Sequence, residues 1–394
     1  MKAKTKLKVV EIIDQSFLGG GQRHVFLLAS RINPEIFEVR VCSSPEGPLV
    51  DQLKQAGVVH HGLYLRKRSP WKSSCELRDF LAREAFDLVH THGGVAGLSA
   101  RWAAFRAQVP VIVHTLHGIH YLHYRNPFLK WLLIWQERIM SQKTHKVVCV
   151  SEANAREAIK YRLAPESKIV VIPNGLDWPA KPLLSPQTKK DKKLKLAQLF
   201  GLAPDSYFIG TVARLHRQKG LIYLFQAWPE VSQKIKQAVL LVVGGGPLEK
   251  KFRNYLSQKG WESRILLLGE RDDVSEFYGA LDLFVLPSLW EGLPLVLLEA
   301  AQWALPVVAT DIDGCREVIT SGETGLLVPP AQSGALAEAI IWMREHPQEA
   351  RHWGVNLFRK ASQRFSLQMM ISRVEELYLE LIQERGLKKI PLVN

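Results

Sequence analysis

The sequence predicts an α/β protein with two domains, each an open parallel sheet covered by helices on both faces. Short β-branched apolar runs alternate with longer helical patterns along nearly the whole chain, as repeated βαβ units require. The 394 residues are too many for one ordinary domain but suit two domains of roughly 100–200 residues. A stretch rich in glycine, proline and lysine, residues 174–195, interrupts the alternation and marks the connection between the domains.

The first βαβ series starts directly at the N-terminus. Its strands are compact and apolar on both faces, as strands of buried parallel sheets are. They are expected at residues 8–14, 37–43, 86–91, 109–115, 146–151 and 168–173, with helices at 22–32, 50–56, 73–84 and 97–108.

The second series follows the lysine-rich tract and ends in a long helical pattern. Its strands are expected at residues 208–213, 238–243, 265–268, 282–287, 306–309 and 325–328. The final helix, residues 367–384, has more apolar residues at helical spacing than a small second sheet needs. We therefore expect domains at 1–180 and 181–366, and a separate C-terminal helix within 367–394.

Composition and charge exclude several classes of protein. Hydrophobic residues make up 47% and charged residues 23%, which is typical of a globular chain with a full core. No apolar run approaches the roughly 18–20 residues that span a bilayer, and no apolar signal-peptide core precedes the first strand. The four cysteines are scattered, so neither a disulfide framework nor a zinc ribbon is encoded. The expected location is the cytoplasm.

The net charge of +14 is concentrated in the first half of the chain. Residues 1–180 contain 25 basic and 15 acidic residues, whereas the remainder contains 27 and 23. Two basic segments of this half, 64–72 and 121–146, contain interleaved aromatic residues. These aromatic residues include Trp71, Tyr124, Phe128, Trp131 and Trp135.

Cationic and aromatic side chains on one amphipathic element suit an anionic membrane surface. A helix packed on its own sheet, with a solvated basic edge, would give the same pattern. Nucleic acid is a third partner for positive charge, but no recognised nucleic-acid motif accompanies these segments, and we expect no such partner.

Several motifs are too weak to define a function. The glycine turn at Gly19–Gly21 lets backbone N–H groups approach a phosphate, but it lacks the spacing of a dinucleotide fingerprint. The absence of a Walker A sequence argues against a P-loop nucleotidase. Asp311 and Asp313 match the acidic triplet of metal-dependent sugar transferases. A single triplet is near chance in a chain of this length, so we interpret it as loop structure.

Four histidines recur at every third residue after the fourth strand: His114, His117, His120 and His123. Imidazole suits zinc and its neighbours in the periodic table. No carboxylate or cysteine lies nearby in the sequence, and Gly118 interrupts any helix. We interpret the segment as a polar strand-end loop bordering an interdomain cleft, and we expect no metal site.

The second domain contains residues that indicate a reaction. Arg214 and Lys219 lie five residues apart at the end of its first strand, where two cations can clamp a diphosphate. A solvated basic turn explains these two residues equally well when they are considered alone. Farther along, Glu291 lies on a loop and Glu299 about two turns into the following helix. A carboxylate beside an anion site can accept hydrogen bonds from sugar or ribose hydroxyls.

With its seven intervening residues, the Glu291–Glu299 segment resembles the E-x7-E signature of retaining glycosyltransferase family 4, which has the GT-B fold. Other motifs follow in the order found in that family, over about residues 7–385. They are Gly19-Gly20 with Gln22-Arg23-His24, His117-Gly118, Pro173-Asn174-Gly175-Leu176-Asp177, Arg214 with Lys219-Gly220, Gly244-Gly245-Gly246-Pro247 and Gly314 with Glu317. The combination is highly specific, although each motif alone is not.

The resemblance implies two Rossmann-like, doubly wound domains facing a central cleft, with the C-terminal helix crossing back to the first domain. It implies that Arg214 and Lys219 neutralise the diphosphate of a nucleotide-sugar donor as the sugar–phosphate bond breaks. Glu299 is expected to bind the ribose, and Glu291 and His117 the transferred sugar. The other donor-binding positions implied are Gly19, Gly20, Gly245, Arg271, Gly292, Leu293 and Pro294.

The same resemblance implies retention of anomeric configuration by front-face attack, with neither a metal ion nor a protein nucleophile. The N-terminal half is similar to bacterial enzymes that assemble capsule, exopolysaccharide or lipid-linked glycans. The implied donor is therefore a UDP-sugar, and the implied acceptor a glycan or a polyprenyl-linked lipid. The expected location becomes the inner face of the cytoplasmic membrane, with peripheral binding. The alternatives are a nucleotide-sugar epimerase or glycogen-synthase-like enzyme on the same fold, and a non-catalytic scaffold of a glycan-assembly complex.

Overall fold

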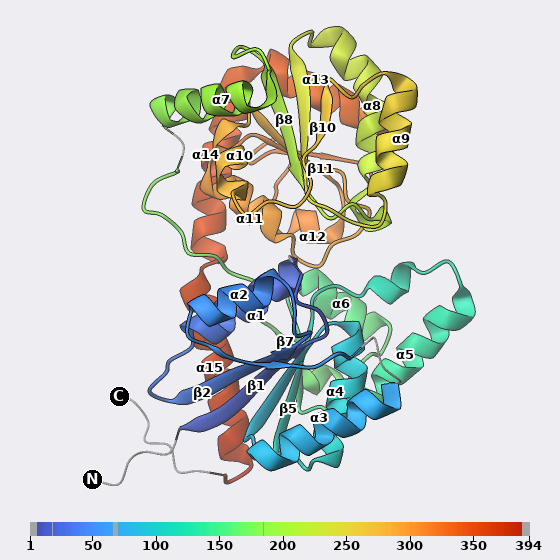
Figure 1. Ribbon diagram of the computed structural model, residues 1–394, viewed down its shortest axis with the longest axis vertical. Coiled ribbons are helices and arrows are strands. Elements are labelled where there is room, and N and C mark those ends of the chain that lie inside the picture. Colours follow the sequence, from blue (N-terminus) through green and yellow to red (C-terminus); the bar gives the residue numbers. More distant parts are fainter. Residues whose placement is uncertain (1–5, 18, 66–69, 184, 388–394) are drawn as a thin grey trace. The chain divides into compact units, whose positions relative to one another are not determined.

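The computed structural model describes residues 6–17, 19–65, 70–183 and 185–387, with the backbone alone at positions 70–72, 95 and 186. The chain divides into two compact units: residues 1–175 together with 367–394, and residues 176–366 (Figure 1). Each unit contains a sheet whose strand pairs are all parallel. The predicted α/β class is confirmed.

The first unit has a seven-stranded sheet in the order β3-β2-β1-β4-β5-β6-β7. Its strands are β1 (Leu7–Ile13), β2 (Phe37–Ser43), β3 (Val59–Gly62), β4 (Leu88–His92), β5 (Val111–Leu116), β6 (Lys146–Cys149) and β7 (Ile169–Val171). Its helices are α1 (Gly20–Arg31), α2 (Pro48–Gln55), α3 (Pro70–Glu84), α4 (Gly94–Arg106), η1 (His120–His123), α5 (Pro127–Gln142), α6 (Glu152–Lys160), η2 (Glu166–Lys168) and α15 (Leu367–Glu384).

The second unit has a six-stranded sheet in the order β10-β9-β8-β11-β12-β13. Its strands are β8 (Tyr207–Val212), β9 (Ala238–Val243), β10 (Ile265–Leu267), β11 (Leu283–Leu286), β12 (Val307–Thr310) and β13 (Leu326–Val328). Its helices are α7 (Pro186–Phe200), η3 (Arg217–Lys219), α8 (Leu221–Lys234), α9 (Glu249–Lys259), α10 (Val274–Ala280), α11 (Leu295–Gln302), α12 (Asp313–Arg316), α13 (Ser333–Glu345) and α14 (Pro347–Arg364).

Local sequence signals explain several helix N-termini. Asn126, Ser151 and Ser185 each accept a hydrogen bond from a backbone N–H three residues later, and they cap α5, α6 and α7. Proline occupies the first turn of α5 and α7, where its missing N–H costs nothing. The twelve strands expected from apolar runs are all present, with ends shifted by up to two residues. The edge strand β3 was not predicted, because its sequence, Val-His-His-Gly, contains no apolar run.

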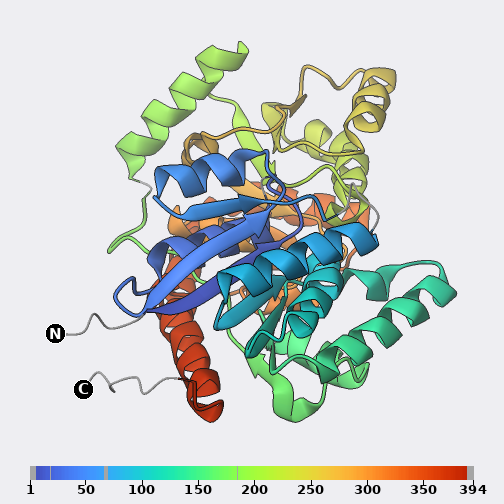
Figure 2. The ribbon, with the colours of Figure 1, turned by 60° about the horizontal axis from the view of Figure 1, so that its bottom comes forward.

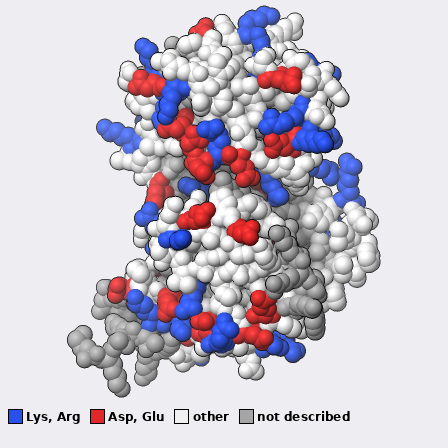
Figure 3. Space-filling model, viewed as in Figure 1, with Lys and Arg blue, Asp and Glu red and all other residues white. Residues whose placement is uncertain are grey.

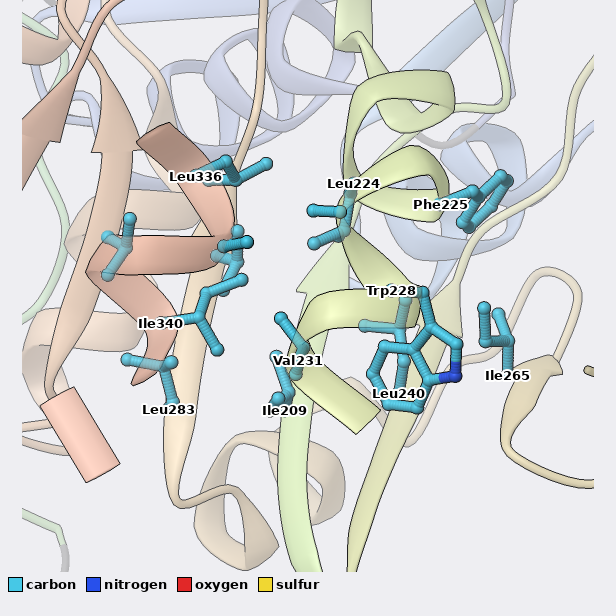
Figure 4. Packing of buried hydrophobic residues seen from close by; sticks show 14 of the residues in the cluster. Ile209, Leu224, Phe225, Trp228, Val231, Leu240, Ile265, Leu283, Leu336 and Ile340 are labelled. Atoms are coloured by element: carbon cyan, nitrogen blue, oxygen red, sulfur yellow. The ribbon is translucent and has the colours of Figure 1, made fainter. Parts of the chain in front are cut away.

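The core of the second unit lies between its sheet and two helices, α8 and α13. Figure 4 shows Leu224, Trp228 and Val231 of α8 packed among strand residues such as Ile209 and Leu240. Burial of this apolar surface stabilises the α8 side of the sheet at about 25 cal/mol per Å². The sheet thereby becomes a rigid support for the loops at its carboxyl edge.

The C-terminal helix α15 belongs to the first unit, although it follows the second unit in the sequence. Figures 1 and 2 both show it (red) beside the sheet of the first unit. Its apolar side chains at helical spacing (Met370, Val374, Leu377, Leu381) are buried. Tyr378, also fully buried, brings a phenol group into the first unit.

Among the described residues, no helix combines the length and the apolar character that crossing a bilayer requires. The predicted basic segment at 64–72 lies partly outside the described residues, which resume at position 70 and omit the side chains of residues 70–72.

Candidate active site

The second unit reverses its strand order at β8, because β9 lies on one side of β8 and β11 on the other. In open parallel sheets, ligands bind at such a switch point, beside the carboxyl ends of the strands. The loop after β8 (residues 213–220) and the loop after β11 (residues 287–294) both leave the sheet here. They contain half of the residues that the sequence predicts for catalysis and donor binding.

The structure brings Lys219 and Glu291 into direct contact across these two loops. Lys219 Nζ lies 2.5 Å from Glu291 Oε1, and Ser288 Oγ donates to the same oxygen at 2.7 Å. Gln218 Nε2 donates to the carbonyl of Trp290 at 2.9 Å and to Glu291 Oε2 at 3.3 Å. Glu291 is thus fixed by three neighbours, while Lys219 and Glu291 remain 18% and 8% exposed. An ammonium has three N–H donors, so Lys219 can keep Glu291 and still donate to an anion.

Two glycines permit this close approach of the loops. Gly220 has φ +60°, and a Cβ there would lie 2.0 Å from the carbonyl oxygen of Pro287. A Cβ at Gly314, in α12, would lie 2.7 Å from the carbonyl oxygens of Glu291 and Gly292. Any side chain at either position would push the Glu291 loop away from Lys219.

Arg214 lies exposed on the same loop as Lys219. Burial, and then the charges of Arg214, Lys219 and Arg217, lower the pKa of His216. Three cations therefore act on one imidazole ring, which stays neutral at pH 7. Such a positive field stabilises the negative charge of a diphosphate.

Glu299 lies half-buried on α11 and accepts a hydrogen bond from Tyr278 Oη at 2.9 Å. Pro294 is the N-cap residue of that helix, and Gly292 and Leu293 are buried in the loop that precedes it. The structure therefore places the E-x7-E segment as the sequence predicts, with its first glutamate on the loop and its second on the helix.

Two predicted donor-binding residues lie on loops after the neighbouring strands β9 and β10. Gly245 accepts a hydrogen bond from Leu215 N at 2.8 Å and approaches Glu270 so closely that a Cβ would lie 2.9 Å from Glu270 Cγ. Arg271 forms a two-pronged pair with Asp273, at 2.7 and 2.9 Å, on its own loop. The Arg271 guanidinium is therefore already bound by a carboxylate.

The acidic triplet after β12 is held by a single arginine. Arg316 binds Asp311 at 2.6 Å and Asp313 at 3.1 Å, and these side chains are exposed. These ion pairs fit the interpretation of the triplet as loop structure.

In the first unit, the glycine turn leads directly into α1. Gly19 is the N-cap residue and accepts a hydrogen bond from Arg23 N at 2.9 Å, and Gly20 is the first helical residue. A Cβ at Gly20 would meet no atom within 4 Å, so open space lies beside the start of this helix. Gly20 therefore belongs to the helix, whereas the sequence analysis assigned it to the turn.

The first unit has its own switch point between β1 and β4, and there it buries a group of ionisable side chains. Glu11 on β1 pairs in register with His90 on β4, and His92 lies two residues farther along the same strand. Glu11 Oε2 accepts a hydrogen bond from His92 Nε2 at 2.6 Å, and Oε1 accepts one from Tyr378 Oη at 2.7 Å. All four residues are fully buried.

His117 and His24 extend this group toward the end of the sheet. His117 Nε2 lies 3.1 Å from His92 Nδ1, and the rings of His117 and His24 meet edge to face with centroids 4.8 Å apart. His24 Nδ1 lies 2.9 Å from Asn174 Oδ1. We refer to Glu11, His24, His90, His92, His117 and Tyr378 as the buried histidine cluster.

Burial sets the charge state of this cluster. It lowers the pKa of His24 to about 3, that of His92 to about 4, and that of His117 well below its usual value. Burial alone would raise the pKa of Glu11, but contact with His90 and His92 holds it well below its usual range. At pH 7, Glu11 is therefore a buried carboxylate, and His24, His92 and His117 are neutral imidazoles.

The four histidines spaced three residues apart do not form one group. His114 Nδ1 binds Thr91, whereas His120 and His123 lie in η1, and only His117 joins the cluster. The sequence analysis missed Glu11, His90, His92 and Tyr378 as members of a site. The available signal was an i, i+2 pair of histidines in a buried strand, since such a pair faces one side of the sheet.

Two triplets of the described residues bring possible metal-ligand atoms within 4.8 Å of one another. They are His24, His92 and His117, and Glu11, His90 and His92. One hydrogen bond already joins His92 to His117 in the first triplet, and another joins Glu11 to His92 in the second. The expected absence of a metal ion stays a prediction.

Two parallel-sheet units, one of which brings Lys219 and the Glu291 loop together at its switch point, are the arrangement that the resemblance to GT-B glycosyltransferases implies. The comparisons with known proteins agree. The family model "Glycosyltransferase Family 4" matches residues 18–178, and the model "Glycosyl transferases group 1" matches residues 206–346. The chain belongs to the family 4 glycosyltransferases and is a transferase enzyme.

Three known proteins illustrate the relationship. The chain is 28% identical over 388 residues to a UDP-Gal:alpha-D-GlcNAc-diphosphoundecaprenol alpha-1,3-galactosyltransferase of Escherichia coli, covering 96% of this chain and 98% of that protein. It is 27% identical to the capsular polysaccharide biosynthesis glycosyltransferase CapM of Staphylococcus aureus, over 73% of this chain and 75% of that one. Anabaena Alr3699/HepE, solved with UDP-glucose, superposes with a TM-score of 0.82 at 22% identity, covering 95% and 100% of the two chains. At that identity the likeness shows the fold.

Proposed function

We propose that this glycosyltransferase moves a hexosyl or N-acetylhexosaminyl group from a UDP-sugar to a lipid-linked or glycan acceptor, with retention of anomeric configuration and without a metal ion. The E. coli relative uses UDP-Gal and a diphosphoundecaprenol acceptor according to its name, which makes this donor and acceptor type the first to test. The Lys219–Glu291 contact at the β8/β11 switch point is the observation that carries the proposal.

The proposed reaction exchanges one bond at the anomeric carbon for another. The bond from that carbon to the donor phosphate oxygen breaks, and a bond to the acceptor hydroxyl oxygen forms on the same face of the sugar. The acceptor proton passes to the departing phosphate oxygen, and UDP leaves. Negative charge grows on the diphosphate during this step, and Lys219 and Arg214 stabilise it.

The remaining predicted residues bind the donor in this proposal. Glu291 accepts a hydrogen bond from a hydroxyl of the transferred sugar, while Lys219 and Ser288 hold its carboxylate in place. Glu299 accepts hydrogen bonds from the ribose, and His117 bonds to the transferred sugar. Arg271 contacts the base from the loop where Asp273 holds it.

The test is an incubation of the full chain with UDP-galactose and GlcNAc-diphosphoundecaprenol, with mass spectrometry of the lipid product. We expect UDP release only with acceptor, a lipid product heavier by one hexose, and no loss of activity after chelation of divalent metals. Proton NMR of the new linkage should show the α configuration of the donor. UDP release without acceptor, or a β linkage, would contradict the proposal.

Two variants and a matched control assign the site. Lys219→Ala and Glu299→Ala should each abolish most turnover without unfolding the chain, because both side chains reach solvent at the edge of the sheet. Lys195→Ala removes a lysine of the same unit whose side chain is 74% exposed, and it should have no effect. Full activity of both site variants would refute the assignment.

The same experiment separates the alternatives. An epimerase would change the UDP-sugar without any acceptor, and a scaffold would bind UDP-sugar or partner proteins without forming product. The contact between Lys219 and Glu291 favours the transferase, because a scaffold has no need for both partners of the pair.

We also propose that the enzyme binds peripherally to an anionic membrane at its cytoplasmic face, and helix α5 supports this proposal. Its exposed side chains Phe128, Trp131 and Trp135 lie on one helical face, 69%, 57% and 48% exposed, and their rings stack in sequence. Figures 1 and 2 show η1 and α5 projecting from the edge of the first unit. In Figure 3 this projection, at the right, is mostly uncharged. Aromatic rings of this kind insert at the boundary of headgroups and acyl chains.

The opposite face of α5 is anchored in the protein. Arg101 of α4 forms a buried bidentate pair with Glu137 of α5, at 2.7 and 2.8 Å. This pair neutralises the acidic residue of the helix, whereas Lys130 and Arg138 remain at its surface beside Tyr161. Basic residues near the membrane contribute about 1 kcal/mol each to binding on anionic lipid.

Vesicle co-sedimentation tests this part. The wild-type chain should bind vesicles containing phosphatidylglycerol, less so at high salt, and the variant with Phe128, Trp131 and Trp135 changed to Ser should not. The matched control changes Leu194 and Leu199 to Ser, which are similarly exposed on α7 of the other unit. Equal binding by both variants would overturn the membrane role of α5.

A further inference from the structure

The hydrogen bonds of the buried histidine cluster determine where its protons lie. A carboxylate only accepts hydrogen bonds, so Tyr378 and His92 must both donate to Glu11. Tyr378 gives its single hydrogen to Glu11 Oε1, and His92 gives the hydrogen of Nε2 to Oε2. His90 Nδ1 lies 2.5 Å from Tyr378 Oη and must therefore be the donor of that bond. The other ring nitrogen of His90, Nε2, lies 2.6 Å from Thr115 Oγ1.

On its other side, His92 is hydrogen-bonded to His117. A neutral imidazole has one N–H, and that of His92 is used on Glu11, so His92 Nδ1 is an acceptor. Its partner at 3.1 Å, His117 Nε2, must then carry a hydrogen. The remaining nitrogen of His117, Nδ1, is left with a lone pair. The low pKa of His92 agrees with this assignment, because it keeps His92 neutral.

His24 also has one ring nitrogen with an unused lone pair, for a different reason. Its Nδ1 donates to Asn174 Oδ1, so its Nε2 has a lone pair. His24 Nε2 and His117 Nδ1 are both buried, and neither has a hydrogen-bond partner among the described residues. Buried acceptors without partners cost free energy. Two such acceptors on adjacent rings indicate a ligand that donates hydrogen bonds to them.

We propose that Tyr378, Glu11 and His92 are positioning residues that hold His117 with its proton on Nε2, so that His117 Nδ1 and His24 Nε2 together accept hydrogen bonds from hydroxyl groups of the transferred sugar. This inference rests on the proposed function, since it takes the sugar as the ligand of His117. Beyond the proposed function, it specifies the tautomer of His117, names His24 of α1 as a second hydrogen-bond acceptor for the sugar, and gives α15 a role at the site. The C-terminal helix supplies the phenol that orients Glu11, 367 residues away in the sequence.

UDP alone lacks the transferred sugar, so its affinity should not depend on the cluster, whereas the affinity of the UDP-sugar should. Loss of the hydrogen bonds made by His92 leaves His117 free to rotate or to change tautomer. The contact between His117 and the sugar is then weaker, both in the bound donor and in the transition state. A merely structural role of the cluster would alter the affinities for UDP and UDP-sugar together.

Two substitutions of His92 test this, because a glutamine amide can both donate and accept hydrogen bonds whereas leucine can do neither. In His92→Gln, one amide nitrogen can still donate to Glu11, and the amide oxygen can still accept from His117. In His92→Leu, both bonds are lost. We expect His92→Leu to lower kcat/KM and the UDP-sugar affinity about tenfold or more, which is the typical effect of one lost hydrogen bond, while His92→Gln stays within about threefold. The affinity for UDP should be unchanged in both.

His60→Gln is the matched control, because His60 is a half-buried histidine of the same unit that is hydrogen-bonded to Ser43 outside the cluster. It should leave every constant unchanged. Equal losses in His92→Gln and His92→Leu, or parallel losses of UDP and UDP-sugar affinity, would overturn the inference.

A measurement on the wild-type chain needs neither a variant nor a substrate. In the full chain labelled with ¹⁵N-histidine, NMR should show His117 neutral with hydrogen on Nε2 and a lone pair on Nδ1. Hydrogen on Nδ1, or a stoichiometric zinc ion in the purified protein, would overturn the inference. If His117 has the expected tautomer but no UDP-sugar binds, the proposed function fails and the hydrogen-bond chain stands.

Discussion

The two units place ionisable groups differently at the corresponding switch points of their sheets. In the first unit these groups lie on the strands themselves, as Glu11, His90 and His92 do, and they are fully buried. In the second unit the strands are apolar, and the charged residues Lys219 and Glu291 lie on the loops that follow, partly exposed. Loop residues can exchange a partner for a ligand at little cost. Groups on strands are fixed, and they suit the orientation of a neighbour such as His117.

Acidification should reveal the largest difference. The pKa of His24 is about 3 and that of His92 about 4, and those of His114 and His117 are well below the unfolded value of about 6.5. The stability that these neutral histidines provide is complete above pH 6.5 and is lost as the pH falls, at about 1.4 kcal/mol per pH unit for each histidine. Below pH 4.5, protonation of Glu11 in the unfolded chain adds to the loss, because its folded pKa is lower.

The first unit should therefore open before the second when the pH is lowered from 7 to 5. Hydrogen exchange with mass spectrometry resolves the two units peptide by peptide. Earlier loss of protection in residues 185–365 would contradict the comparison.

Removing one carboxylate from each site should give the second largest contrast. Glu11→Ala leaves His92 and Tyr378 as buried donors without an acceptor and should destabilise its unit by about 1–3 kcal/mol for each donor. Glu291→Ala leaves Lys219, which is 18% exposed and can be rehydrated, so it should cost about 1 kcal/mol. Urea titration followed by pulse proteolysis measures both. Equal costs would show that burial does not distinguish the two sites.

The site in the second unit should matter less for stability than the buried histidine cluster, but more for enzyme activity. Lys219→Ala should lower kcat about 10²–10³-fold, as loss of one group that stabilises transition-state charge does, and leave the unfolding midpoint nearly unchanged. Lys219→Arg keeps the charge and should retain more activity than Lys219→Ala. Steady-state kinetics with UDP-galactose and GlcNAc-diphosphoundecaprenol gives kcat, and thermal denaturation gives the unfolding midpoint. A large stability loss in Lys219→Ala would mean that the pair is structural.

The smallest contrast compares two tyrosines. Tyr378→Phe removes a phenol that bonds two fully buried partners, and it should cost about 1–3 kcal/mol. Tyr278→Phe removes a bond to the half-buried Glu299, which water can replace, and it should cost less than about 1 kcal/mol. Thermal denaturation of both variants is the measurement. The comparison would fail if Tyr278→Phe were the more destabilising.

The sequence predicted the fold because local periodicity encodes burial. Apolar runs identified twelve of the thirteen strands, and the C-terminal helix was predicted with its observed bounds, Leu367–Glu384. β3 was missed since its residues are half-exposed at the sheet edge. In the second unit, the spacing of Glu291 and Glu299 and the position of Lys219 identified the loops that come together at the switch point.

Only the tertiary structure decided the partners of these residues. The sequence could not show that Lys219 binds Glu291, since this contact depends on which strand lies beside β8. Glu11, His92 and Tyr378 come from the first strand, the fourth strand and the last helix, and strand order and register bring them together. A chain specifies locally which side chains face inward, whereas the partner that an inward polar group meets depends on the packing of distant segments.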